Sequence, residues 1–418
     1  MTVPFMKIVV GGHVDHGKST LIGRLLHDAG ALAEGRVEEI LRASRDSAPE
    51  WAFLIDHLRE EREQEMTIDS AQAFFTTPRR AYRIIDAPGH KEFLRNMVTG
   101  ASQADAAVLV VDVEAGVLEQ TRRHATVLAM LGRREVVLAI NKMDRLDGRR
   151  EAFERVAREA EAALAEMGLR ARRIIPISAR CGWNLATRPD ALAWYEGPTV
   201  FEALDAIEPP ESLADRPLRF PLQDLYQVNG ARVAVGRIES GRLAAGQEVL
   251  ALPRGETLRV ASVRKYLAEP LAAEAGESIG LTFEPATALE RGVVLCHPDA
   301  PAPVVERFEA NLFWLSDDGW NAGDRLVLRC TTQEAPCRIE RVTERINSST
   351  LAVIERNAAR LAPTEVGRAI LALERPLVLE PFADGRPLGR FVLVKRGLVS
   401  AGGTVGPATH SAMEAAQA

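Results

Sequence analysis

The segment GHVDHGKS, residues 12–19, constrains the fold of this chain more than any other stretch. It fits the pattern G-x-x-x-x-G-K-[ST], follows the apolar run KIVV and precedes the helical pattern TLIGRLL. A strand, a glycine-containing loop and a helix in this order are typical of a phosphate-binding P-loop. Gly12 and Gly17 let the backbone curve, so that the following amides point inward at the amino end of the helix.

The P-loop pattern also assigns roles to side chains. The residues expected to contact the nucleotide phosphates are Asp15, His16, Gly17, Lys18, Ser19 and Thr20. Lys18 would neutralise the β- and γ-phosphate oxygens and is the first catalytic candidate, and Ser19 would be a ligand of Mg²⁺. The loop therefore predicts a nucleoside triphosphate with its metal ion.

A second motif, NKMD at residues 141–144, follows a later apolar run and indicates which base is bound. The carboxylate of Asp144 can accept two hydrogen bonds from N1 and N2 of guanine, which adenine cannot offer. Asn141 can bond the purine edge, and the methylene stem of Lys142 can cover the ring. The next apolar run ends in Ser178, Ala179 and Arg180, which are further candidates for base contacts. GTP and GDP are the predicted ligands.

A third motif, DAPGHKEF at residues 86–93, lies between an apolar run and a helical pattern. Such strand-to-helix turns lie at the carboxyl ends of strands, where open α/β sheets bind ligands. Asp86 stands where P-loop enzymes place a second acidic residue for Mg²⁺. The amide of Gly89 would approach the γ-phosphate, and His90 would orient the attacking water as the second catalytic candidate.

Thr67, in the segment EREQEMTID, is the candidate that completes the Mg²⁺ shell. It precedes the next apolar run and follows a long charged stretch that could order with GTP and loosen after hydrolysis. The same stretch would also suit the solvated face of a helix, an alternative that the sequence leaves open.

The chain changes its pattern near residue 208. Before that point apolar runs alternate with helical patterns, which predicts parallel strands with crossover helices. After it come short alternating strands separated by glycine turns, which are typical of small β-barrels. Proline clusters mark the boundaries. We predict an α/β P-loop GTPase domain over 1–208, all-β barrels over 209–302 and 303–400, and a flexible tail over 401–418.

Composition narrows the environment and the partners. The net charge of −6 and pI near 5.9 provide no overall basic field, so a nucleic-acid partner is not expected on charge alone. The four cysteines are scattered without C-x-x-C spacing, as in a reduced cytoplasmic protein. No run approaches 18 apolar residues, and neither a signal peptide nor a membrane partner is expected.

These motifs together resemble the translation-factor class of GTPases, which includes elongation factor Tu, elongation factor 1-alpha and the GTPase subunit of bacterial ATP sulfurylase. The resemblance covers nearly the whole chain. Within the class, STLIGRLLHDAG, LREEREQEMTID, GVLEQTRRHATVLAMLG and WYEGPTVFEALD look most like the large subunit of sulfate adenylyltransferase. This resemblance implies that GTP hydrolysis assists a small adenylyl-transferring partner subunit, which makes adenosine 5'-phosphosulfate and pyrophosphate from ATP and sulfate.

Four positions depart from that subunit family. His16 and Ala87 stand where an acidic residue and a threonine are usual, and both look closer to elongation factor 1-alpha. Glu65 and Met66 replace the usual glycine and isoleucine before the switch threonine. Methionine fills a volume similar to that of isoleucine, so Met66 can still form an apolar gate beside His90.

Two functions therefore stand side by side. The first is a GTPase subunit in a heteromeric sulfate adenylyltransferase, and the alternative is an elongation-factor-like GTPase that binds aminoacyl-tRNA. The tRNA-binding alternative would require clustered basic residues on the barrels. In this part of the sequence the arginines are interspersed with acidic residues. A fused bifunctional protein with adenosine phosphosulfate kinase is disfavoured, because the sequence contains no second P-loop.

Overall fold

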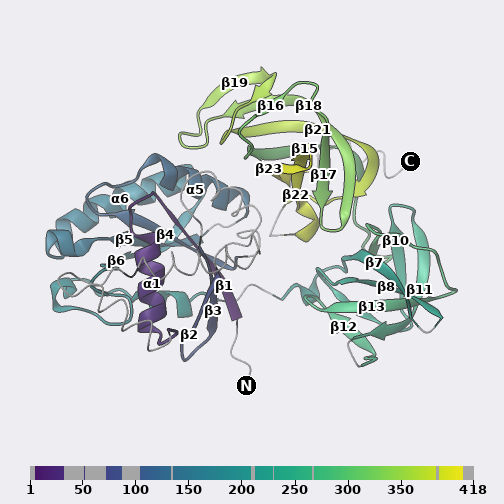
Figure 1. The fold of residues 1–418 in the computed structure, drawn as a ribbon, viewed down its shortest axis with the longest axis horizontal. Helices are drawn as coiled ribbons and strands as arrows, with labels where there is room; N and C mark the ends of the chain where they lie inside the picture. Colours follow the sequence, from purple (N-terminus) through teal and green to yellow (C-terminus); the bar gives the residue numbers. More distant parts are fainter. Residues whose placement is uncertain are drawn as a thin grey trace. The chain divides into compact units, whose positions relative to one another are not determined.

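The computed structural model describes residues 5–32, 51, 72–86, 104–132, 135–208, 212–228, 230–265, 268–382 and 386–407. The chain forms two compact units, of which the first runs to Pro210 and also takes in Ser348–Leu351, and the second comprises the rest (Figure 1). An α/β unit followed by barrel-forming strands confirms the predicted fold class.

The first unit is built on a six-stranded sheet in the order β2-β3-β1-β4-β5-β6. Its strands are β1 (Phe5–Gly12), β2 (Gln72–Thr76), β3 (Ala81–Asp86), β4 (Ala106–Asp112), β5 (Glu135–Asn141) and β6 (Arg170–Pro176). Only the edge strand β2 is antiparallel to its neighbour. Strand β4 is buried along its whole length, which explains its unbroken apolar sequence AAVLVV before Asp112. The carboxyl ends of the parallel strands meet at one edge of the sheet.

Helices flank this sheet in the expected alternation. They are α1 (Lys18–Asp28), α5 (Glu119–Met130), α6 (Arg150–Glu166) and α7 (Val200–Asp205), with the 3-10 turns η2 (Met143–Leu146) and η3 (Asp190–Leu192). Thr199 caps α7 by accepting from the amide of Glu202, whose carboxylate accepts from the Thr199 amide in return. No helix within the described ranges is long and apolar enough to cross a membrane.

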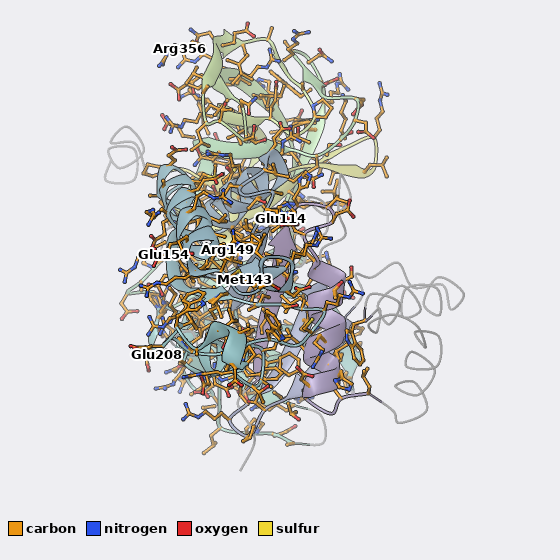
Figure 2. All side chains as sticks on the ribbon, turned by 90° about the vertical axis from the view of Figure 1, so that its left-hand side faces the viewer. Glu114, Met143, Arg149, Glu154, Glu208 and Arg356 are labelled. Carbon is orange, nitrogen blue, oxygen red and sulfur yellow. The ribbon has the colours of Figure 1, made fainter. Side chains whose placement is uncertain are left out.

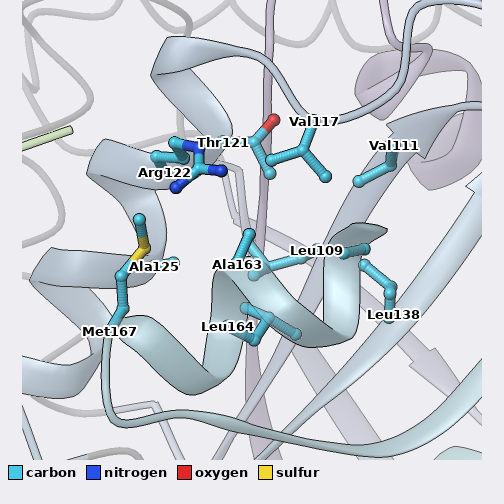
Figure 3. A pocket seen from close by; sticks show the side chains of 11 residues that line it. Leu109, Val111, Val117, Thr121, Arg122, Ala125, Leu138, Ala163, Leu164 and Met167 are labelled. Atoms are coloured by element: carbon cyan, nitrogen blue, oxygen red, sulfur yellow. The ribbon is translucent and has the colours of Figure 1, made fainter. Parts of the chain in front are cut away.

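Helices α5 and α6 pack over β4 and β5 through small and apolar side chains (Figure 3). Ala125 from α5 and Ala163 and Leu164 from α6 line the seam, together with Leu109 and Leu138 from the strands. Small residues allow the two helices to approach closely over the sheet. This packing fixes α5, which supplies side chains to the functional site.

The second unit begins with the turn η4 (Leu213–Asp215) and a closed barrel in the order β10-β11-β13-β8-β7-β14. Its strands are β7 (Phe220–Val228), β8 (Ala231–Arg237), β10 (Glu248–Leu252), β11 (Glu256–Arg264), β13 (Ser278–Glu284) and β14 (Val294–Cys296), and β9 (Arg242–Ala244) pairs with β12 (Ala272–Glu274). Inward residues such as Leu258, Val260 and Val263 form its core.

A second set of strands follows in the order β17-β22-β23-β15-β21-β18-β19, and an added pairing of β17 with β18 joins six of them into a ring. The strands are β15 (Val304–Trp314), β17 (Leu326–Cys330), β18 (Gln333–Ile346), β19 (Val353–Ala358), β21 (Val366–Val378), β22 (Arg390–Lys395) and β23 (Leu398–Val405), with the pair β16 (Trp320–Asn321) and β20 (Arg360–Leu361) and the turn η5 (Pro387–Gly389). Strand β23 continues to Val405, beyond residue 401, where the tail is expected to start, because its last residues pair with β15.

The two barrels share one hydrophobic cluster, to which Val294 contributes from the first and Trp314 from the second. A buried ion pair also links them. The Nη2 atom of Arg219 lies 2.8 Å from Oε1 of Glu380, and both side chains are almost fully buried, at 6% and 5% exposure. Arg219 also donates to the carbonyl of Ala300 at 2.9 Å. Its charge is thus compensated where the barrels meet.

Candidate functional site

The P-loop lies where β1 ends at Gly12 and α1 begins at Lys18. Gly12 has a φ of 142°, and a Cβ atom there would lie 2.3 Å from the carbonyl oxygen of Val110. Gly17 has a φ of 88°, and its Cβ would lie 2.4 Å from Nδ2 of Asn141. Both positions therefore exclude a side chain, which brings the loop backbone close to β4 and β5.

The remaining loop residues lie around the first turn of α1. Asp15 is exposed and left-handed, with a φ of 60°, whereas Ser19 and Thr20 are half-buried. The ammonium group of Lys18 is buried and donates to the carbonyl of His13 at 2.6 Å. The six loop residues that the motif predicts to contact phosphate thus lie between the end of β1 and the first turn of α1.

Helix α5 holds the P-loop from the side, a role that the motifs do not predict. The Nδ1 atom of His124 accepts from the amide of Gly12 at 2.9 Å, and Oε1 of Gln120 accepts from the amide of Val14 at 3.0 Å. His124 and Gln120 are four residues apart and so share one face of the helix. Two polar side chains at this spacing in a helix next to a P-loop are the sequence signal that could have identified them.

His16 is buried in the loop at 2% exposure. Its Nδ1 atom lies 3.3 Å from both the carbonyl oxygen of Val110 and the amide nitrogen of Asp112. Burial lowers the pKa of His16 to about 4, and the nearby positive charges of His13 and Lys142 act in the same direction. The ring is therefore neutral at pH 7 and ties the P-loop to the end of β4.

Burial also lowers the pKa of His124 well below its usual value, and the ammonium group of Lys18 adds to this effect. The unfolded chain binds protons at both histidines as the pH falls below about 6.5, while the folded chain does not. We therefore expect the free energy of unfolding to decrease between pH 6.5 and 4, by at most about 1.4 kcal/mol per pH unit for each histidine. Urea titrations at several pH values measure this slope, and a flat profile would contradict the buried neutral state.

Asn141 joins the two nucleotide motifs at the end of β5. Its Nδ2 atom donates to the carbonyl of His16 at 2.8 Å, and its Oδ1 atom accepts from the amide of Ala179 at 2.9 Å. One side chain thus holds the P-loop on one side and the loop after β6 on the other. Because Asn141 is buried, both bonds are shielded from water.

The rest of NKMD forms the start of η2. Met143, labelled in Figure 2, is fully buried, and its amide donates to the carbonyl of Ile177 at 3.1 Å. This anchor sets the backbone of Lys142 and Asp144 on either side. The Oδ1 atom of Asp144 is buried and has no hydrogen-bond partner in the part of the chain that the structure describes. A buried carboxylate oxygen without a donor fits a ligand that supplies N–H groups, as guanine does.

The loop after β6 carries the remaining predicted base contacts. Ser178 and Ala179 are buried, and the Ser178 hydroxyl accepts from the amide of Cys181 at 3.1 Å. Arg180 is exposed, and its carbonyl accepts from Nη1 of Arg24 at 3.3 Å. The structure therefore brings Ser178 and Ala179 to Asn141, while Arg180 faces solvent.

The structure describes no functional group of four predicted residues. Thr67, Gly89 and His90 lie outside the described residues. Asp86 is the last residue of β3, opposite Val10 in the neighbouring strand, which places its backbone at the same sheet edge as the P-loop. The roles of these four residues in Mg²⁺ binding and hydrolysis remain predictions, as do the roles of the other predicted site residues.

Comparison with known proteins shows which families the two parts of the chain resemble. Residues 3–210 match the family model of the elongation factor Tu GTP binding domain, and residues 307–406 match that of the GTP-eEF1A C-terminal domain-like family. Elongation factor 1-alpha of Archaeoglobus fulgidus is 40% identical over 404 residues, covering 94% of this chain and 95% of its own. That of Pyrococcus woesei is 38% identical over 419 residues, covering 96% and 97%. The bifunctional enzyme NodQ of Rhizobium sp. is 35% identical over 397 residues, covering 94% of this chain and 61% of its own.

Proposed function

The chain belongs to the translation-factor class of GTPases, the family of elongation factor Tu and elongation factor 1-alpha, and from this premise we propose that it is an elongation-factor-like GTPase that binds aminoacyl-tRNA. The observation that carries the nucleotide part is Asn141, which joins the P-loop to the base-recognition loops by two buried hydrogen bonds. The relatives named elongation factor 1-alpha, similar over nearly their full lengths, support the carrier part.

In this proposal the phosphates lie along residues 15–20, with Lys18 neutralising the oxygens of the β- and γ-phosphates. Asp144 accepts from guanine, and the stem of Lys142 covers the base. The close approach at Gly12 and Gly17 supports this placement, as does the Oδ1 atom of Asp144, which has no hydrogen-bond partner among the described residues. Ser178 and Ala179 complete the base side, with the exposed Arg180 next to them in the same loop.

Mg²⁺ would be held by Ser19 with Thr67 and Asp86, and it would supply positive charge to the developing phosphate oxygens. The position of Ser19 in the first turn of α1 and of Asp86 at the end of β3 supports this set. Gly89 would donate its amide to the γ-phosphate, and His90 would orient water. Because phosphoryl transfer depends mainly on orientation and charge, a neutral imidazole suffices for His90.

Ser19→Ala should raise the Mg²⁺ concentration needed for half-maximal GTP hydrolysis on the order of tenfold or more, because one oxygen ligand is lost. Ser19→Thr keeps the hydroxyl and is the matched control. GTPase rates measured over a range of free Mg²⁺ give both values. An unchanged Mg²⁺ requirement in Ser19→Ala would remove Ser19 from the metal shell.

A second candidate is the GTPase subunit of a heteromeric sulfate adenylyltransferase, which the resemblance of four sequence segments favours. Ion pairing on the barrels also favours this candidate. A protein that binds tRNA neutralises backbone phosphates with lysine and arginine side chains, which releases counterions from the RNA. Many barrel arginines already face acids, as in the pairs of Arg307 with Glu340, Arg329 with Glu334, Arg345 with Glu365, and Arg356 (Figure 2) and Arg368 with Glu344. These contacts reduce the positive potential that tRNA would meet.

Two measurements on the purified chain separate the candidates. The carrier proposal expects GTP-dependent protection of aminoacyl-tRNA from deacylation. The sulfate proposal expects GTP to increase the yield of adenosine 5'-phosphosulfate when a small adenylyl-transferring subunit, ATP and sulfate are added. Protection without any effect on adenosine 5'-phosphosulfate supports the carrier, and the reverse result replaces it with the second candidate.

A further inference from the structure

We propose that Asp112, the last residue of β4, is a positioning residue that fixes Lys142 for the guanine base. None of the nucleotide motifs includes Asp112, and its placement emerges only from the fold. The inference rests on the proposed role of Lys142 in GTP binding and adds the group that orients it.

The carboxylate of Asp112 is enclosed by three donors. Its Oδ2 atom lies 2.7 Å from Nζ of Lys142. Its Oδ1 atom accepts from the amide of Glu114 at 2.8 Å and from that of Ala115 at 3.4 Å. Because the side chain is only 7% exposed, it has little freedom to turn away from these donors.

The backbone of Asp112 is fixed as firmly as its side chain. Asp112 lies opposite Asn141 in the parallel pairing of β4 and β5, and the next amide, that of Val113, donates to the Asn141 carbonyl at 3.0 Å. The amide of Asp112 itself lies 3.3 Å from Nδ1 of His16 in the P-loop. The residue therefore stands where the loops after β1, β4 and β5 meet.

The charges at this point suit an ion pair. Burial alone would raise the pKa of Asp112, but hydrogen bonds from Lys142 and the Glu114 amide outweigh it, and the net pKa is lowered. The carboxylate is thus ionised at neutral pH and opposes the Lys142 ammonium.

Lys142 has a left-handed backbone, with a φ of 67°, and its side chain is about one-fifth exposed. A lysine stem in solution samples many rotamers, and a stem held at its far end by Asp112 samples few. The side chain of Lys142 is then already ordered in the folded protein before the nucleotide binds. The entropic cost of ordering it on binding is smaller, which raises the affinity for the nucleotide.

Asp112→Asn tests this role, because the amide keeps the shape of the carboxylate and removes its charge. We expect the dissociation constants of GDP and GTP to rise together by about tenfold, the usual size of coupling between contacting groups. Single-turnover hydrolysis at saturating GTP should stay within about threefold of the unaltered chain, since no reacting atom is touched. Glu114→Gln, which removes an exposed carboxylate of the same loop paired with Arg145, is the matched control and should leave both values unchanged.

A double-mutant cycle with Lys142→Ala shows whether Asp112 acts through Lys142. We expect Asp112→Asn to add little once the Lys142 side chain is gone. Additive losses, or an equal fall of hydrolysis rate and affinity, would show a general structural role and overturn the inference. If the unaltered chain failed to bind GDP, the proposed function itself would fail, a result separate from either outcome of the cycle.

Discussion

Asp144→Asn is expected to convert the chain from a GTP-preferring to an XTP-preferring protein, with a change in relative affinity of roughly 10²-fold or more. The aspartate accepts two N–H groups from guanine, whereas an asparagine at the same place presents an NH₂ donor to one of them. Xanthine carries a carbonyl in place of the exocyclic amine and so matches the new donor. The effect is large because the Oδ1 atom is buried, where an unmatched polar pair is costly.

Competition of GTP and XTP for fluorescent GDP measures the exchange of preference. Asp147→Asn is the matched control, because Asp147 lies three residues on, is exposed, and has a left-handed φ of 49° that asparagine also adopts. Unchanged GTP preference in Asp144→Asn would show that the base is recognised elsewhere.

His90→Ala is expected to slow GTP hydrolysis by roughly 10²-fold or more, the scale of a lost positioning or acid-base group. GTP affinity should stay nearly the same, since the P-loop and the base-recognition loops supply the binding contacts. A slower rate of GTP hydrolysis at an unchanged GTP affinity is therefore the result that we expect.

Single-turnover hydrolysis at saturating GTP gives the rate, and GDP titration of the same preparation confirms that the site is intact. A rate within a few-fold of the unaltered chain would mean that another group orients the water. A parallel loss of GDP binding would instead indicate damage to the fold around β3.

Much of the first unit follows from its sequence, because its strands and loops carry strong local signals. The apolar runs KIVV, AAVLVV and EVVLAI coincide with β1, β4 and β5. A parallel strand buried on both faces must be continuously apolar, so that the run itself marks the strand. The P-loop and NKMD are equally local, and the structure brings them together at the carboxyl ends of these strands.

The supports of the site could not be predicted in the same way. Gln120 and His124 act on the P-loop from a helix more than a hundred residues away, and Asp112 meets Lys142 only through the pairing of β4 with β5. Such contacts depend on the order of strands in the sheet, which no single motif records. For the same reason, no sequence pattern marks Arg219 and Glu380 as partners.

The pairing of Arg219 with Glu380 means that the two barrels are not interchangeable modules. A chimera whose second barrel came from a relative lacking the matching acid would leave Arg219 buried without its carboxylate partner, at a cost of about 3–5 kcal/mol. Either barrel produced without the other would expose the shared apolar cluster as well. Recombination within this half of the chain is therefore constrained to move both barrels together, or to exchange both charged residues at once.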